Sequence, residues 1–449
     1  MSEERQNQLH IAHTPILGLG DRRFSLGRAA PDFTGRGVEI RQMVDRFQAG
    51  TVGTFLLWGM GGVGKTTLAQ SVAHAVADQF PDALIELNLQ AMSDVPISSS
   101  EAMASIIHAF HPDEKLPDKK PELRARYRTV LYGKRALILF DNVKNEEQVQ
   151  DLLAAAPTVG FILTSRNALA LSSVLSISLD VLPSSDSIKF LARITSSEVN
   201  NRNLSAIAKL CGHLPLALRV AGSNLTIRKS QSTSQYIEAL EVENTRLERL
   251  KGKTITDDVK AVLSLSAREL VHENARLAQR WQMLSVFPAD FDKFAVAAVW
   301  DLISDSSRAS GTVEEELTAL IDRSLVQYDT NTDRYSLHDL MRPISREVFE
   351  YVEGHPLQAD SARCIAAAKR RFAIFYCNKA SEISLHHNKN DSHIRQDLDN
   401  IASEITNINH GQAWANRSRH LGICTTNLFG GRLYEKNIMT IRTTLINGL

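Results

Sequence analysis

Cysteine is scarce in this sequence: four cysteines stand among 449 residues, and no two of them form a Cys-x-x-Cys pair. So few cysteines cannot supply a disulfide framework for a chain of this length, which favours a reducing compartment, the cytoplasm. An excess of charge of one sign is also lacking, because 51 Lys and Arg residues balance 51 Asp and Glu residues. A general electrostatic attraction to nucleic acid or to an anionic membrane surface is therefore excluded.

Long apolar runs are lacking as well. No segment approaches the roughly 18 consecutive apolar residues of a membrane span, and the first residues, MSEERQNQLH, carry charges with no apolar stretch behind them. We therefore expect neither membrane insertion nor export. The composition, 43% hydrophobic and 23% charged residues, is typical of folded globular domains rather than of a disordered chain. On length, roughly three or four domains are expected.

The periodicity of the apolar residues divides the first half of the chain into blocks. Residues 1–30 lack sustained periodicity and are predicted to be an irregular segment. Over residues 31–180, short apolar runs alternate with helical patterns, which predicts a parallel β-sheet with helices between its strands. Helical patterns alone follow over residues 181–254, which predicts a helical domain. The fold class expected from these blocks is multidomain, α/β followed by α.

The second half of the chain begins with a different pattern. Residues 255–350 combine three helical stretches with two alternating stretches, 324–328 and 334–337, that a turn-rich segment joins. Three helices and a hairpin predict a winged helix. Residues 351–449 are helical by pattern, without an internal repeat that can be aligned. The core of the winged helix is predicted to hold five aromatic residues that recur near helical spacing: Trp281, Phe287, Phe291, Phe294 and Trp300.

The strongest motif lies between an apolar run, TFLLW, and a helical pattern. It is GMGGVGKT, residues 59–66, a full match to the P-loop pattern G-x-x-x-x-G-K-[ST] in the required context. The backbone N–H groups of such a loop surround the phosphates of a nucleotide, the lysine reaches the β- and γ-phosphates, and the hydroxyl binds Mg²⁺. The residues predicted to bind the nucleotide here are Gly59, Gly61, Gly62, Val63, Gly64, Lys65, Thr66 and Thr67.

A second site residue is predicted where the apolar run 137–140 ends. Asp141 stands in the position of a Walker B acid, which holds Mg²⁺ at the carboxyl edge of a parallel sheet. The metal-binding residues are therefore predicted to be Thr66 and Asp141. The next residue is Asn142, where hydrolases of this kind usually have an acid. Because an amide cannot accept a proton from the attacking water, we expect at most slow ATP hydrolysis.

Further motifs, in a fixed order, resemble those of NB-ARC proteins of the STAND class of signal-transducing NTPases. Phe33-Thr34-Gly35-Arg36 resembles the F-x-G-R element, and the resemblance implies that Phe33 and Arg36 border the adenine. Ile162-Leu163-Thr164-Ser165-Arg166 resembles the strand whose arginine senses the γ-phosphate. With Lys65 and Asp141, Arg166 would complete the groups that act on the phosphates.

Two later motifs extend the resemblance to about residue 345. GHLPLA, residues 212–217, resembles the G-x-P-L motif, which implies that Pro215 and Leu216 pack on the nucleotide. Leu337-His338-Asp339 resembles the M-H-D motif, with Leu in place of Met, and implies that His338 reaches the β-phosphate of ADP. The family also implies an effector domain before this core and a repeat array after it. Residues 351–449 are accordingly expected to begin a helical, tetratricopeptide-like array.

The resemblance implies a switch that is closed with ADP and opens with ATP to self-associate and to activate an effector or answer a sensor partner that the sequence does not identify. Two alternatives stay open on the residues. One is a steadily working ATPase, against which Asn142 argues. The other is a DNA-binding regulator that uses the helix around residues 313–323, but Glu314, Glu315 and Glu316 at its start would repel phosphate and make direct DNA binding unlikely.

Overall fold

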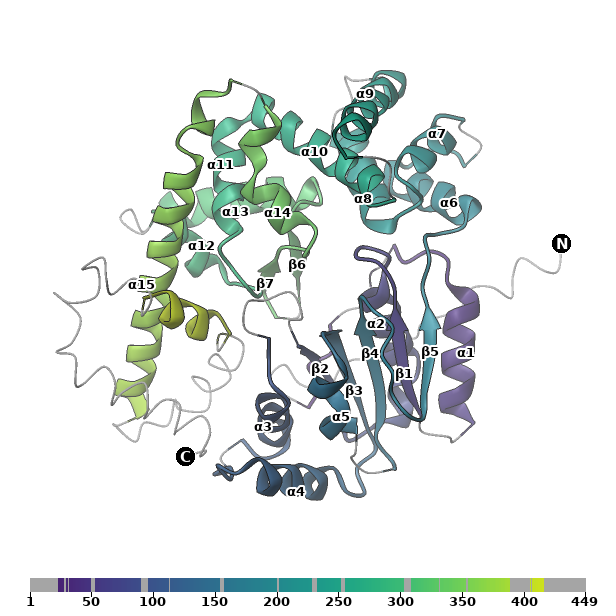
Figure 1. Cartoon of the computed structure of the whole chain (residues 1–449), viewed down its shortest axis with the longest axis vertical. Helices are drawn as coiled ribbons and strands as arrows, with labels where there is room; N and C mark the ends of the chain where they lie inside the picture. The colour runs from purple at the N-terminus through teal and green to yellow at the C-terminus, as the bar shows by residue number, and fades with distance from the viewer. Residues whose placement is uncertain are drawn as a thin grey trace. The chain divides into compact units, whose positions relative to one another are not determined.

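The computed structural model separates into two units (Figure 1). The first holds the described residues up to Met60 together with Lys65–Leu179, and the second holds Gly61–Gly64 together with the described residues from Asp180 onward. The structure describes residues 23–27, 30, 32–49, 53–89, 96–112, 114–153, 157–199, 202–227, 232–251, 255–302, 308–330, 332–352, 354–387, 404 and 406–415.

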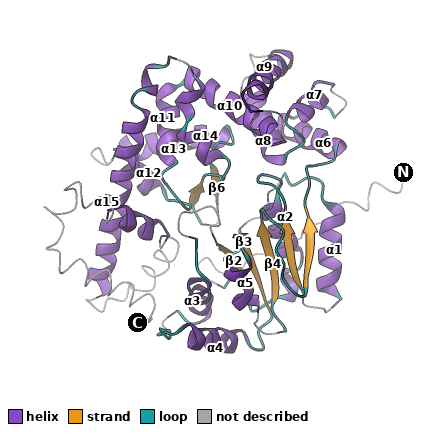
Figure 2. Ribbon diagram, in the orientation of Figure 1, coloured by secondary structure: helices purple, strands orange, loops and turns teal. Residues whose placement is uncertain are grey.

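A parallel sheet of five strands forms the centre of the first unit as described, in the order β2-β3-β4-β1-β5 (Figure 1). Figure 2 draws its strands in orange. Its strands are β1 (Thr54–Trp58), β2 (Ala83–Asn88), β3 (Ala136–Val143), β4 (Gly160–Ser165) and β5 (Val174–Ser178). Phe55, Leu56 and Leu57 of β1 are all fully buried. A continuous apolar run of this kind is what a strand covered on both faces requires, so the predicted parallel sheet is confirmed.

Helices connect these strands and cover the sheet. They are α1 (Gly37–Gln48), α2 (Lys65–Ala75), η1 (Ala77–Gln79, a 3₁₀ helix), α3 (Ser99–Phe110), α4 (Lys120–Leu131) and α5 (Glu146–Leu153). The core on one side brings Met103 of α3 and Tyr127 of α4 against Phe140 of β3, all fully buried. Helix α3 begins with a reciprocal capping box between Ser98 and Glu101, which satisfies backbone groups at the helix start.

Two segments of the first unit differ from the sequence-based expectation. Strand β5 was not expected, because it lies at the sheet edge and only Ile177 among its residues is buried. Part of the segment predicted to be irregular pairs with β2: Phe24 forms a parallel bridge to Leu84, whose N–H donates to the carbonyl of Arg23 at 2.6 Å. Leu26 is buried beside it. Residues 1–22 lie outside the described part of the chain.

The second unit begins with a helical region. Its helices are α6 (Ser184–Thr195), α7 (Arg202–Leu210), α8 (Pro215–Ile227), α9 (Thr233–Lys251) and α10 (Ile255–Glu273). Helices α7 and α8 are separate, because Gly212 and His213 between them adopt left-handed conformations, with φ of 57° and 55°.

The elements of a winged helix follow, but not the three helices that the sequence predicted: the first helical stretch of the predicted block 255–350 is α10 of the helical region, and the bounds of the domain stay a prediction. The winged helix comprises α11 (Ala275–Leu284), α12 (Lys293–Val299), α13 (Arg308–Asp322) and the antiparallel hairpin of β6 (Gln327–Asp329) and β7 (Arg334–Ser336). Trp281, Phe287, Phe291 and Trp300 are buried in its core, but the prediction was wrong for Phe294, which is 66% exposed. Helix α12 was not recognised as a helix, and it buries Ala295 and Val296 while the neighbouring Phe294 is left outward.

The described chain ends in further helices that pack on the winged helix. They are α14 (Met341–Arg346), the 3₁₀ helices η2 (Val348–Tyr351) and η3 (Pro356–Gln358), and the long helix α15 (Ser361–His387). Residue 404 and residues 406–415 are also helical. Among the helices that the structure describes, none combines the length and the apolar character that crossing a membrane demands.

Candidate functional site

The P-loop leaves β1 at Trp58 and enters α2 at Lys65. Gly59, Gly62 and Gly64 have φ values of 149°, 78° and 94°, which only glycine adopts without strain. At Gly59 a side chain is doubly excluded, because its Cβ would collide with the carbonyl oxygen of Leu179. The loop is therefore fixed in a shape in which backbone groups, rather than side chains, line its surface.

Lys65 lies inside this loop and is 8% exposed. Its Nζ donates hydrogen bonds of 2.9 Å to the carbonyl oxygens of Gly59 and Met60. These carbonyls solvate the ammonium group by their dipoles but bring no formal negative charge. A cation held in this way within a phosphate-binding loop has the charge that a nucleotide phosphate needs.

Three oxygen-bearing side chains converge at the carboxyl edge of the sheet. Asp141 Oδ1 accepts from the hydroxyl of Thr66 at 2.7 Å and from the hydroxyl of Thr164 at 2.6 Å. Asp141 is 5% exposed and Thr164 is fully buried. Thr66 and Asp141 thus lie together, and their hard oxygen donors fit Mg²⁺, which takes one or two protein ligands together with substrate phosphates. That they bind Mg²⁺ stays a prediction. The described residues hold no cluster of three or more His, Cys, Asp or Glu side chains that could bind a metal by themselves.

Thr164 is a residue of this site whose role the sequence did not reveal. It is the third residue of the predicted I-L-T-S-R strand, and its hydroxyl joins two neighbours in β3: it donates to Asp141 and accepts the backbone N–H of Asn142 at 3.0 Å. The signal available in the sequence was a hydroxyl residue within an otherwise apolar strand.

Asn142 adopts a left-handed conformation, with φ of 56°, at an irregularity of β3 where the pairing with β4 shifts. Asparagine tolerates this conformation better than most residues. Its Nδ2 donates to Oδ1 of Asn88 on β2 at 3.3 Å. The left-handed backbone at this position therefore favours asparagine in place of the usual acid. The sequence motif alone does not show this backbone requirement.

Arg166 directly follows β4, whose last residue, Ser165, pairs in register with Trp58 at the end of β1. The backbone N–H of Gly59 also donates to the carbonyl of Ser165 at 3.3 Å. Arg166 is half-buried. The structure thus brings Arg166 to the same sheet edge as the P-loop and Asp141, because parallel strands all end there.

The F-x-G-R element forms the start of α1. Arg36 has a left-handed φ of 64° at the helix N-terminus, and its Nη1 donates to Oε1 of Glu39 at 3.3 Å. The N–H of Phe33 donates to the carbonyl of Ala30 at 3.1 Å. These bonds shape the entry into the helix; that Phe33 and Arg36 border the adenine stays a prediction.

The tip of the P-loop, Gly61–Gly64, contacts two predicted motifs of the second unit. The N–H of Leu216 donates to the carbonyl of Gly62 at 3.3 Å, just after Pro215 opens α8. A Cβ on Gly61 would lie 3.3 Å from the side chain of Leu340, two residues after His338. Both motifs therefore contact the segment Gly61–Gly64, within the second unit.

One ring nitrogen of His338 is an acceptor, which favours one tautomer of the neutral imidazole. Its Nδ1 accepts the backbone N–H of Leu340 at 3.1 Å, and its carbonyl accepts the N–H of Met341 at 2.8 Å. A neutral imidazole that accepts at Nδ1 carries its proton on Nε2. In this tautomer Nε2 of His338 is a hydrogen-bond donor, as binding an anionic phosphate requires.

Comparisons with known proteins agree with these motifs. A model of the NB-ARC domain matches residues 38–194. Regulatory protein AfsR of Streptomyces griseus is 32% identical over 345 residues, which are 75% of this chain and 34% of that protein. Probable disease resistance RPP8-like protein 2 of Arabidopsis thaliana is 26% identical over 352 residues, which are 70% of this chain and 37% of that protein.

Among solved structures, a STAND protein with a tetratricopeptide repeat sensor from Pyrococcus horikoshii matches 93% of this chain and 65% of that chain, with 13% identity and a TM-score of 0.49. The chain spans about a third of the length of the curated relatives named above, 34% and 37%. What those longer proteins do as wholes therefore does not transfer directly to this chain.

Proposed function

Because the chain is an NB-ARC protein of the STAND class of P-loop NTPases, which implies nucleotide binding, we propose that it is a signalling switch gated by exchange of ADP for ATP. With ADP it is closed; with ATP it opens, self-associates and acts on an effector. The scarcity of cysteine favours the cytoplasm as its place of action.

One observation carries this proposal: the tip of the P-loop is bonded to parts that would have to move. Gly62 accepts a hydrogen bond from Leu216, and Gly61 lies against Leu340 beside His338. A change in the phosphates held by the loop would therefore act directly on α8 and on the segment after the wing. A P-loop that served binding alone would not need these contacts.

The phosphate-binding groups divide into two sets. Lys65 would bind the β-phosphate of either nucleotide, and Thr66 and Asp141 would hold Mg²⁺, which neutralises phosphate charge when it is bound. Arg166 would reach only the γ-phosphate, and Nε2–H of His338 would donate to the β-phosphate of ADP. The switch depends on the second set, because a ligand with equal affinity for both states shifts nothing, however tightly it binds.

Asn142 keeps hydrolysis slow in this proposal, which distinguishes a switch from a steadily working ATPase. It cannot accept a proton from water, and its side chain bonds to Asn88. A lasting ATP state gives the open form time to assemble.

Direct DNA binding by α13 is the weaker candidate function, although AfsR is named a regulatory protein. Glu314 of α13 pairs with Lys293 at 2.7 Å, and Glu316 pairs with Arg280. These acids belong to the winged helix's own ion pairs and present no positive surface to a phosphate backbone.

The test is calorimetric titration of the purified chain with ADP and with ATP, for wild type and Lys65→Ala. We expect the variant to lose binding of both nucleotides, because a charge-assisted contact to phosphate contributes about 1.5–3 kcal/mol and desolvation of the pocket adds to its loss. Lys119→Ala, which removes a lysine side chain 79% exposed on the same unit, is the control. Unchanged binding in Lys65→Ala would refute the assignment of the site.

A further inference from the structure

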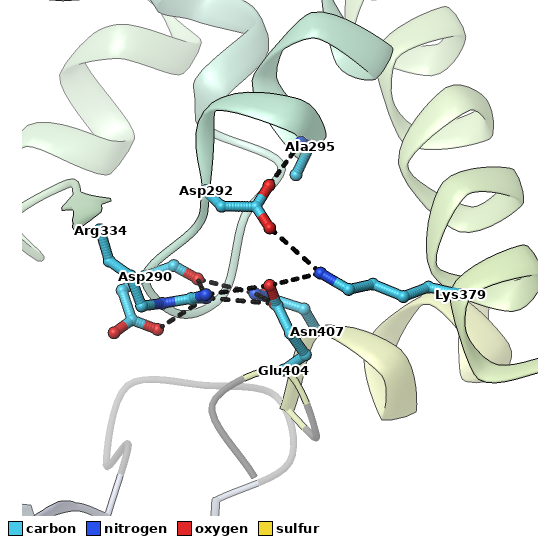
Figure 3. Close-up of polar contacts among 7 residues, drawn as sticks. All are labelled: Asp290, Asp292, Ala295, Arg334, Lys379, Glu404 and Asn407. Carbon is cyan, nitrogen blue, oxygen red and sulfur yellow. Dashed lines mark hydrogen bonds and ion pairs between the residues drawn. The ribbon is translucent and has the colours of Figure 1, made fainter. Parts of the chain in front are cut away.

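Five charged side chains and one amide gather at one place on the winged helix (Figure 3). The helical residues at the end of the described chain supply Glu404 and Asn407, which are 1% and 0% exposed. The other members come from the loop before α12, from β7 and from α15, and they are Asp290, Asp292, Arg334 and Lys379. None of them belongs to the proposed nucleotide site.

Glu404 is the centre of this ionic cluster. Its Oε1 and Oε2 accept from Nη1 and Nη2 of Arg334 at 2.9 and 3.1 Å, a bidentate pair. Oε1 also accepts from Nζ of Lys379 at 2.9 Å. Burial alone would raise the pKa of Glu404, but the hydrogen bonds and charges of Arg334 and Lys379 hold it below its usual range. Glu404 is therefore ionised at neutral pH although water does not reach it.

The partners of Glu404 are themselves bonded to the winged helix. Nη2 of Arg334 donates to the carbonyl of Asp290 at 2.9 Å. Lys379 also donates to Oδ2 of Asp292 at 3.1 Å, while Oδ1 of Asp292 accepts the N–H of Ala295 at 2.7 Å and so caps α12. A displacement of Glu404 would thus disturb, through Lys379, the Asp292 side chain that caps α12.

Asn407 adds a second contact from the same helix. Its Nδ2 donates to the carbonyl of Asp290 at 2.7 Å and to Oε2 of Glu404 at 3.2 Å. Residues three apart lie on one face of a helix, so Glu404 and Asn407 form a single polar face directed at the winged helix. Arg334 and Asn407 share the carbonyl of Asp290, which links the hairpin, the loop and the terminal helix at one atom.

Aromatic side chains of the winged helix and α15 pack near the buried members of the cluster, whereas the Asp290 side chain is 46% exposed. Phe287 and Phe291 stack with centroids 4.2 Å apart, and Phe287 meets Phe372 of α15 at 5.4 Å. A Cβ on Gly411 would lie 3.2 Å from Cβ of Tyr376, so the terminal helix approaches α15 closely. Removing Arg334 would take the bidentate partner from the carboxylate of Glu404, and a buried charge that loses its partner is far more costly than one in water.

We propose that the winged helix and α15 together carry a docking surface, formed by Asp290, Arg334 and Lys379, whose occupant is the helical segment of the same chain that holds Glu404 and residues 406–415. The docking is permanent, so the winged helix and the helices that follow it move as one body. The buried ion pairs favour this orientation of the joint, because a placement that separates Glu404 from Arg334 and Lys379 leaves buried charges without partners. This proposal does not rest on the nucleotide switch.

Hydrogen exchange of the wild-type chain tests permanence without any substitution. We expect the peptides covering 290–296 and 404–415 to have the same protection factor against exchange. We also expect that factor to agree within about threefold between samples without nucleotide, with ADP and with a non-hydrolysable ATP analogue. A larger loss of protection in the peptide 404–415 with any nucleotide would show that the contact can be released. That result would refute the proposal of permanent docking. Protection that falls on dilution would overturn the intrachain occupant in favour of a second copy.

Glu404→Gln tests the cluster itself. It keeps the shape of the side chain but removes the charge that Arg334 and Lys379 require, so exchange should accelerate about tenfold or more in 404–415 and in 290–296 together. Asp360→Asn, in the exposed pair with Arg363, is the control and should change neither peptide. Acceleration in 404–415 alone, or in neither peptide, would overturn the coupling. Should Glu404→Gln fail to fold, the wild-type measurement decides the proposal.

Discussion

Lys65 and Arg334 are both cations at 8% exposure, one in each unit, and they are solvated in different ways. The hydrogen bonds described for Lys65 reach carbonyl oxygens, which supply dipoles. Those of Arg334 reach the carboxylate of Glu404 as well, which neutralises its charge. The two described sets of bonds therefore differ in charge: those of Lys65 bring dipoles to a cation in a P-loop, and those of Arg334 include a carboxylate of the protein's own structure.

The largest difference between the two sites should appear in stability. Arg334→Met leaves Glu404 buried without its main partner, and we expect a loss of about 3–5 kcal/mol of unfolding free energy in the second unit. Chemical denaturation, followed by the fluorescence of the buried Trp281, measures this loss. Arg363→Met removes an arginine whose side chain is 87% exposed and should cost less than about 0.5 kcal/mol. Equal losses of unfolding free energy in the two variants would mean that the ion pair of Arg334 with Glu404 matters no more to stability than an exposed pair.

His338→Ala should give the next largest effect, on nucleotide choice. The Leu340 N–H favours the tautomer of His338 with its proton on Nε2, and the loss of one hydrogen bond to a charged phosphate corresponds to about 1.5–3 kcal/mol. ADP affinity should therefore fall roughly ten- to hundredfold, with a much smaller change for ATP. Calorimetry with both nucleotides decides. Equal weakening would indicate general damage to the pocket, and no change would leave His338 with a structural role alone.

Thr164→Val should give a smaller effect at the metal site. The valine keeps the volume of Thr164 but removes the hydroxyl that orients Asp141, a bond of about 1–2 kcal/mol. We expect the Mg²⁺ concentration needed for tight ATP binding to rise about tenfold, with little change in binding measured in EDTA. Thr164→Ser keeps the hydroxyl and should restore the wild-type dependence. A similar loss with and without Mg²⁺ would mean that Thr164 supports the fold rather than Asp141.

The fold could be predicted where one physical signal determines the structure. The bounds of β1 follow from the run TFLLW, and the P-loop from glycines that positive φ requires. Strand β5 was not predicted, because an edge strand needs little apolar surface. Helix α12 was not predicted, because seven residues are too few to show a helical period. Phe294 was misplaced because aromatic spacing alone does not say which face of a helix is inward.

The two polar sites differ even more in what the sequence reveals. P-loop chemistry is local, and its residues stand in fixed order along one loop and the strand ends beside it. The ionic cluster joins Arg334 to Glu404 across 70 positions, and no motif records that distance. One signal was present: Glu404 stands among Ile401, Ile405 and Ile408 at helical spacing, which places a charge near the apolar face of a helix. Its partner could come only from the three-dimensional structure.

Asn142→Asp should give the smallest effect. The sequence suggests that an acid at this position would speed ATP hydrolysis, but the structure predicts only a small gain in rate. An acid at this position would be able to accept a proton from water, which at a well-aligned site contributes 10²–10⁴-fold, on the order of 3–5 kcal/mol. Position 142, however, has a left-handed backbone that suits asparagine, and its Nδ2 donates to Asn88 Oδ1.

An aspartate there would lose that donor and place a carboxylate against the carbonyl oxygen of Asn88, so it is poorly aligned for catalysis. We therefore expect single-turnover phosphate release to rise by no more than about tenfold, which is about 1.4 kcal/mol of barrier. Asn142→Gly, which accepts the same backbone without an acid, is the control and should not accelerate release. A hundredfold rise in Asn142→Asp would show instead that the missing proton acceptor alone keeps the site slow, and that the Asn88 contact places no limit on it.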